Sequence, residues 1–149
     1  MNKPAGKLYT SNPGGLRHLN CEAEIWQITR SGTLIPGTII VRALAPSQEL
    51  FSKYLTTWKN LSPTDWWPEY DSQFLQELES TEKKEILRLL YKKLLSGTNV
   101  VLLCLCKDYN YCHRKLIGEF FTKYGLEVPE LSLNKPKEEK PVQSTIFWE

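Results

Sequence analysis

An apolar run between two amphipathic helical patterns limits the folds open to this chain more than any other feature. The run from Asn99 to Cys106 is apolar at every position after Asn99, as expected of a strand buried on both faces at the centre of a sheet. The segment from Thr81 to Leu95 has glutamates in its first turn, lysines in its last and leucines at helical spacing. Apolar side chains from Leu116 to Tyr124 again follow a helical period. A buried strand between two helices predicts α/β layering with some parallel pairing.

Shorter patterns predict the rest of the sheet and the remaining helices. Ser47 is a good cap for a helix that ends near Trp58. We expect the proline- and tryptophan-rich stretch 63–68 to be a loop, followed by a short helix around Phe74. Runs of β-prone residues bounded by turn residues predict further strands at 8–11, 24–29 and 38–41, and an edge strand at 126–131.

Length and composition place the chain among ordinary globular proteins. Its 149 residues are 41% hydrophobic and 24% charged with a net charge of +2, so no global attraction to nucleic acid is indicated. We expect one domain over residues 1–133, followed by a flexible charged linker and a C-terminal peptide over 134–149. No apolar run is long enough for a bilayer and no signal-peptide pattern is present. We therefore expect a cytoplasmic protein with reduced cysteines and no membrane contact.

Reactive side chains concentrate where the central strand is predicted to end and the next helix to begin. Three of the four cysteines lie here, followed by His113 and Arg114. Cys104 and Cys106 face the same side of a strand, and simple burial explains Cys104 as well as function does. Cys112 opens the helix, where free backbone amides favour anions and lower the pKa of a thiol. Binding sites of open α/β proteins lie at such junctions.

Three kinds of chemistry use these residue types. Cys104, Cys106, Cys112 and His113 are zinc-ligand types, but the spacing C-x-C-x5-C-H is unlike the usual structural zinc motifs. A cysteine-phosphatase loop is excluded, because seven residues separate Cys106 from Arg114 where that loop has five. An anion site with a reactive thiol fits best, so we expect no bound metal and no cofactor. A disulfide between Cys106 and Cys112 stays open, since the sequence does not determine the redox state.

The same segment resembles a known family. The run VVLLCLCKDYNYCHRKLIGEFFTKYG is similar to the signature of the family called domain of unknown function 488, in which a strand ending in cysteine precedes a Cys-His-Arg helix start. One branch also has a Tyr-Thr strand, an I-T-x-K-S-G stretch and an F-A-P-T-W turn. These are similar to 8–11, 28–32 and 44–47 here, with Arg30 in place of the lysine and no tryptophan after Ser47. The resemblance covers roughly residues 7–131.

The resemblance implies a compact, Rossmann-like three-layer α/β domain with a central, partly parallel sheet and a pocket at the carboxyl ends of its strands. Such folds often handle nucleotides, so it also implies a phosphate-bearing nucleotide or nucleic-acid component that the protein binds or processes. Arg30 and Arg42 are weaker expectations for the pocket. The residues that the resemblance assigns to it are Tyr9, Thr10, Ser11, Cys106, Cys112, His113 and Arg114.

The expected roles follow from side-chain chemistry. Arg114 and the helix amides would hold the phosphate. His113 would act as an acid or base, and Cys106 or Cys112 as a nucleophile. Whether the protein is an enzyme stays open, because the resemblance supplies no reaction.

Four aromatic residues, Trp58, Trp66, Trp67 and Tyr70, lie around two prolines upstream of this junction. Packing of a long loop onto the sheet is the favoured interpretation, and stacking on nucleobases is the alternative. Exposure of Trp66 or Trp67 beside the cysteines would favour stacking.

The C-terminal peptide carries a second functional pattern. Gln143, Ile146 and Phe147 form a Q-x-x-I-F sequence, similar to short peptides by which DNA-replication and repair proteins dock on sliding clamps. The glutamine would enter a polar pocket and the two apolar side chains a hydrophobic one. Packing on the same domain or on a second copy in a homodimer are the alternatives. This pattern supports a second hypothesis, a non-enzymatic viral or repair-associated interaction protein with purely structural cysteines.

Overall fold

A four-stranded sheet in the order β1-β4-β2-β3 lies at the centre of the protein, and every strand pair in it is parallel. The computed structural model describes residues 4–133. The fully buried strand β4 (Val100–Leu103) pairs with β1 (Leu8–Ser11) on one side and with β2 (Glu24–Gln27) on the other. The short strand β3 (Ile39–Ile40) extends the sheet beyond β2. The apolar run is therefore the central strand, and the sheet is wholly rather than partly parallel.

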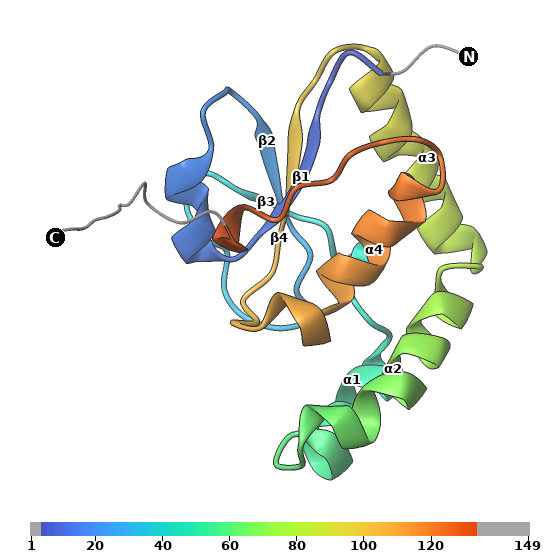
Figure 1. Cartoon of the computed structure of the whole chain (residues 1–149). Coiled ribbons are helices and arrows are strands. Elements are labelled where there is room, and N and C mark those ends of the chain that lie inside the picture. The colour runs from blue at the N-terminus through green and yellow to red at the C-terminus, as the bar shows by residue number, and fades with distance from the viewer. Residues whose placement is uncertain (1–3, 134–149) are drawn as a thin grey trace, which may run out of the picture.

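Within residues 4–133, four α-helices lie around the carboxyl ends of the strands and one face of the sheet. Ser47 caps α1 (Gln48–Lys53), which continues as a π-helical turn over Tyr54–Trp58. The helices α2 (Pro63–Glu77), α3 (Thr81–Leu95) and α4 (His113–Thr122) follow, and Figure 1 shows α3 and α4 on the same side of the sheet. None of the helices within residues 4–133 has the length and apolar content needed to cross a membrane.

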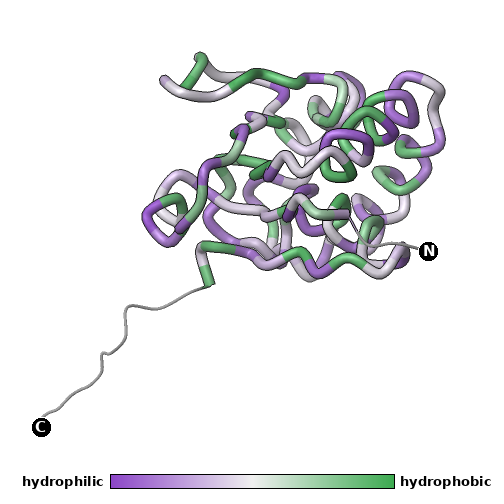
Figure 2. The backbone as a smooth tube through the Cα atoms, turned by 90° about the horizontal axis from the view of Figure 1, so that it is seen from above, coloured by the Kyte–Doolittle hydropathy of each residue, from purple (hydrophilic) through white to green (hydrophobic). Residues whose placement is uncertain are grey.

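Strand residues alternate between two buried faces. One face packs on the helices, and its core members include Leu8, Trp26, Ile28, Val100 and Leu102. The 3-10 helices η1 (Pro13–His18) and η5 (Leu131–Leu133) contact β1 and each other. In Figure 2, hydrophobic and hydrophilic residues alternate along the helical coils, as expected of helices that bury one face only. The Rossmann-like α/β class predicted from the sequence is confirmed.

Two elements differ from the prediction. The stretch 63–68 is the start of α2 and not a loop, because Pro63 occupies the first helical turn, where its missing N–H costs nothing. Trp66, Tyr70 and Phe74 follow at helical spacing and are buried on one side of α2. The segment 126–131 forms only an isolated parallel bridge between Thr10 and Glu130.

Candidate functional site

An open pocket of about 340 Å³ lies beyond the carboxyl ends of β2 and β4. The segment 29–31, which follows β2, forms one side of it, and the segment 104–108, which follows β4, forms another. The start of α4 contributes residues 111–113, and aromatic residues of α1, the π-helical turn and α2 form the wall. Pockets at the carboxyl ends of parallel strands are the usual ligand sites of open α/β folds.

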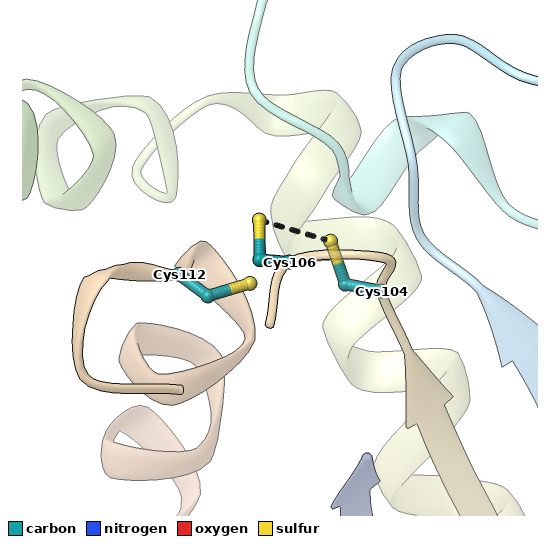
Figure 3. A group of neighbouring side chains, drawn as sticks. All are labelled: Cys104, Cys106 and Cys112. Atoms are coloured by element: carbon teal, nitrogen blue, oxygen red, sulfur yellow. Dashed lines mark hydrogen bonds between the residues drawn. The ribbon is translucent and has the colours of Figure 1, made fainter. Parts of the chain in front are cut away.

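One part of the pocket lining is a cysteine cluster, defined here as Cys104, Cys106, Cys112 and His113. The Sγ atoms of the three cysteines all lie within 4.8 Å of one another, and those of Cys104 and Cys106 are 3.9 Å apart. Figure 3 shows Cys104 and Cys106 on the segment that leaves β4 and Cys112 at the start of α4, with their sulfur atoms turned toward one another. The fold thus brings the predicted Cys106, Cys112 and His113 together and adds Cys104.

A short turn explains why Cys112 returns to the end of β4. The Asp108 carboxylate accepts a hydrogen bond of 2.9 Å from the backbone N–H of Asn110 and so caps the 3-10 helix η4 (Tyr109–Tyr111). Cys112 then serves as the N-terminal cap residue of α4. All four cysteines are free thiols in the structure, with no disulfide between Cys106 and Cys112.

The orientation of His113 determines which of its nitrogen atoms faces the thiols. Its Nε2 lies 2.7 Å from the carbonyl oxygen of Ile28, which can only accept, so Nε2 carries a proton. In the neutral ring Nδ1 then holds a lone pair, and it lies 4.0 Å from Cys104 Sγ and 3.9 Å from Cys112 Sγ. His113 can therefore accept a proton or ligate a metal on the side of the sulfur atoms.

The three thiols differ in how readily they ionise. Hydrogen bonds with Cys106 and Cys112 lower the pKa of the Cys104 thiol well below its ordinary value. The hydrogen bond with Cys104 raises the pKa of Cys106 to about 12, and burial raises the pKa of Cys112 well above its ordinary value. The cluster thus holds one cysteine, Cys104, whose pKa is lowered, and two, Cys106 and Cys112, whose pKa values are raised; the sequence had suggested these last two as nucleophiles.

Arg114 does not reach the pocket as expected. Its side chain is fully buried, and its Nε and Nη2 donate hydrogen bonds of 2.9 and 3.0 Å to the two carboxylate oxygens of Glu130. Its Nη1 donates to the carbonyl oxygen of Cys106 at 2.9 Å and to Cys112 Sγ at 3.3 Å. Every nitrogen of the guanidinium thus has an acceptor within the protein, and the Arg114 side chain does not line the pocket.

The other upstream residues predicted for the pocket also lie elsewhere. Thr10 Oγ1 donates a hydrogen bond of 2.7 Å to Glu130, next to Arg114. Ser11 Oγ donates to the backbone oxygen of Asn12, and the Tyr9 hydroxyl lies 4.0 Å from Cys21 Sγ. None of Tyr9, Thr10 and Ser11 lines the pocket. Gln143, Ile146 and Phe147 of the C-terminal peptide lie outside the described residues.

The aromatic wall combines Trp66 and Tyr70, which the sequence singled out for packing or stacking, with Phe51, Tyr54 and Tyr111, which it did not assign to the site. Trp66 packs between Tyr54 and Tyr111, with ring centroids 5.3 and 6.4 Å away, and all three line the pocket. The packing interpretation therefore holds for Trp66, which is 5% exposed, although its ring is also part of the wall. Its buried Nε1–H has no acceptor among residues 4–133. The helical spacing of Trp66 and Tyr70 was the signal that could have located this wall.

Two cationic side chains lie at the rim of the pocket. Arg30 lines it while its Nε and Nη2 donate to the carbonyl oxygens of Pro46 and Arg42. Lys107 is exposed on the loop after β4. Arg42, by contrast, donates to the backbone of the 29–32 turn and does not line the pocket.

Comparison with known families confirms the resemblance that the sequence shows. Residues 8–125 match the family model DUF488-N3a, described as the active DUF488-N3 subclade. The chain belongs to the DUF488 family. The matched region runs from β1 through the end of α4, so this DUF488 domain includes the whole cysteine cluster. No curated protein and no solved structure matches the chain.

Proposed function

We propose that this DUF488 domain binds a phosphate-bearing nucleotide component in the pocket at the ends of β2 and β4. The base would lie against the aromatic wall, and the phosphate would lie toward Arg30 and Lys107. The cysteine cluster would then lie beneath the bound ring. A volume of about 340 Å³ is at the small end of ligand sites, which suits a mononucleotide better than a dinucleotide.

The observation that carries the proposal is the unpaired indole N–H of Trp66 in an aromatic wall. A buried donor without an acceptor costs about 1–3 kcal/mol, so its retention in a pocket wall calls for a reason. Nucleobases carry ring nitrogens and carbonyl oxygens that accept such a hydrogen bond. They also present a flat face to aromatic side chains, and each such stack contributes about 1–3 kcal/mol.

Charge at the rim supports the phosphate end of the ligand. The Nη1 of Arg30 has no hydrogen-bond partner among the described residues, and Lys107 is exposed on the loop after β4. Arg30 and Lys107 would therefore hold the phosphate in place of Arg114, whose guanidinium nitrogens all have acceptors within the protein.

The proposal is tested by calorimetric titration of the full chain with nucleoside monophosphates, the matching nucleosides and inorganic phosphate. We expect the monophosphates to bind most tightly. Tyr111→Ala should weaken binding roughly 5- to 150-fold, the equivalent of one lost stack. Lys107→Ala should weaken it roughly two- to fivefold, as for an exposed ion pair.

Matched variants outside the pocket serve as controls. Tyr124→Ala and Lys123→Ala remove an exposed tyrosine and an exposed lysine at the far end of α4, and both should bind like the parent. The proposal fails if no monophosphate binds, or if Tyr111→Ala and Tyr124→Ala bind alike.

A further inference from the structure

The positions of the three sulfur atoms in the cysteine cluster resemble one face of a metal-coordination tetrahedron. Zinc bound by thiolates at about 2.3 Å requires sulfur atoms about 3.8 Å apart. Cys104 and Cys106 are 3.9 Å apart at Sγ, and all three Sγ atoms lie within 4.8 Å of one another. Small adjustments of side chains therefore suffice to reach the coordination geometry.

His113 has the orientation that a fourth ligand needs. Its Nδ1 lies 4.0 and 3.9 Å from two of the sulfur atoms, against about 3.6 Å for an imidazole nitrogen and a thiolate on one zinc ion. Its opposite nitrogen donates to the carbonyl oxygen of Ile28. A backbone carbonyl that fixes the second ring nitrogen is a regular partner of metal-bound histidines.

The surroundings of the cluster also suit bound thiolates. The Arg114 guanidinium donates to Cys112 Sγ at 3.3 Å, a contact that would offset part of the cost of burying a metal-bound thiolate there. Cys104 and Cys112 are almost fully buried, whereas Cys106 is exposed on an irregular loop. Cys106 can therefore move to complete the coordination without disturbing the core.

We propose that Cys104, Cys106, Cys112 and His113 bind one divalent metal ion of the zinc class. Thiolate and imidazole ligands select such an ion over magnesium or calcium, which prefer oxygen. The sequence spacing argued against zinc because the usual structural zinc motifs place their cysteine ligands in pairs separated by roughly two to four residues. Here the ligands come from the end of a strand and the start of a helix, so their positions are determined by the fold and not by a local sequence motif.

A disulfide explains the cluster less well. It would join two of the three sulfur atoms and leave only the third thiol to interact with His113 Nδ1. One metal ion engages all four side chains at once, and it would lie in the lining of the pocket described above.

Metal analysis of the reduced full chain, purified without chelator, tests the proposal. We expect one equivalent of zinc, and after exchange one equivalent of Co²⁺ with thiolate charge-transfer absorption and strong tetrahedral d–d bands. Cys106→Ser should weaken metal affinity by more than about 100-fold, because loss of a partner outside the coordination shell already costs about 10- to 100-fold. Since Cys106 is exposed, this variant should keep the circular dichroism of the parent.

Cys21→Ser is the matched control, because Cys21 is a free cysteine outside the cluster. It should retain one equivalent of metal. The proposal is overturned if the reduced parent takes up no stoichiometric Co²⁺, or if Cys106→Ser and Cys21→Ser bind it equally. Metal content is read without nucleotide, so this result is independent of the proposed nucleotide binding.

Discussion

His113 and Arg114 are neighbours at the start of α4, yet they belong to two clusters with opposite properties. His113 faces the cysteine cluster, which lines an open pocket and leaves a ring nitrogen available. Arg114 and Glu130 form a closed pair whose side chains are 0% and 1% exposed. The closed pair has satisfied its polar atoms with protein partners, whereas the cysteine cluster has not. From residue type alone, His113 and Arg114 both look like functional residues. Only their contacts in the structure show that Arg114 supports the fold and that His113 faces the pocket.

The closed pair also contacts the cysteine cluster. Through Nη1, Arg114 holds the carbonyl oxygen of Cys106 and the sulfur of Cys112, so it links the loop after β4 to the start of α4. We infer that Arg114 positions the cluster and does not itself contact a ligand. The variants below separate these two roles, beginning with the largest expected effect.

Removing the charge of Glu130 should cause the largest loss of stability. In Glu130→Gln the buried guanidinium loses its bidentate carboxylate, and breaking a buried pair in this way costs about 3–5 kcal/mol. Urea denaturation measures the change. The exposed neighbour offers a control, since Glu127→Gln should stay within about 0.5 kcal/mol of the parent. Equal effects of the two substitutions would show that the closed pair does not support the fold.

The same pair should make stability depend on acid pH. Burial raises the pKa of Glu130, but hydrogen bonds from Arg114, Ser132 and Thr10 outweigh it and leave the pKa below the ordinary 4.5. The stabilisation is therefore complete above pH 4.5 and is lost as pH falls through the lower folded-state value. Denaturation from pH 6 to 3 should show a steeper decline for the parent than for Glu130→Gln. Parallel curves would contradict the assignment.

Substitutions in the cysteine cluster should change stability least at the cysteine whose side chain is most exposed. In protein stripped of metal, Cys106→Ser should alter the free energy of unfolding by less than about 0.5 kcal/mol, because the side chain is exposed. Cys104→Ser places a hydroxyl in a buried position and should cost about 1–3 kcal/mol. Chelator must be present in both measurements, since bound metal would stabilise only the folded state. A larger loss for Cys106→Ser than for Cys104→Ser would reverse this part of the comparison.

The sequence predicts the scaffold well and the site only in part. The apolar run of β4 and the charge pattern of α3 depend on local periodicity, and both elements appear where expected. Cys106, Cys112 and His113 were located because they flank one junction. The role of Arg114 was missed because its partner, Glu130, lies outside the motif in the sequence. Glu130 is held beside Arg114 by its bridge to Thr10 of β1, which the sequence does not reveal. The stretch 63–68, which carries part of the aromatic wall, was expected to be a loop because Pro63 and Pro68 resemble loop residues, although both lie within α2.

The most direct test of the division between the two clusters is a crystal structure of the full chain grown with a nucleoside monophosphate. We predict ligand density against Trp66, with an acceptor atom at its Nε1, and an intact pair of Arg114 and Glu130. Density for the phosphate on Arg114, with Glu130 displaced, would contradict the account.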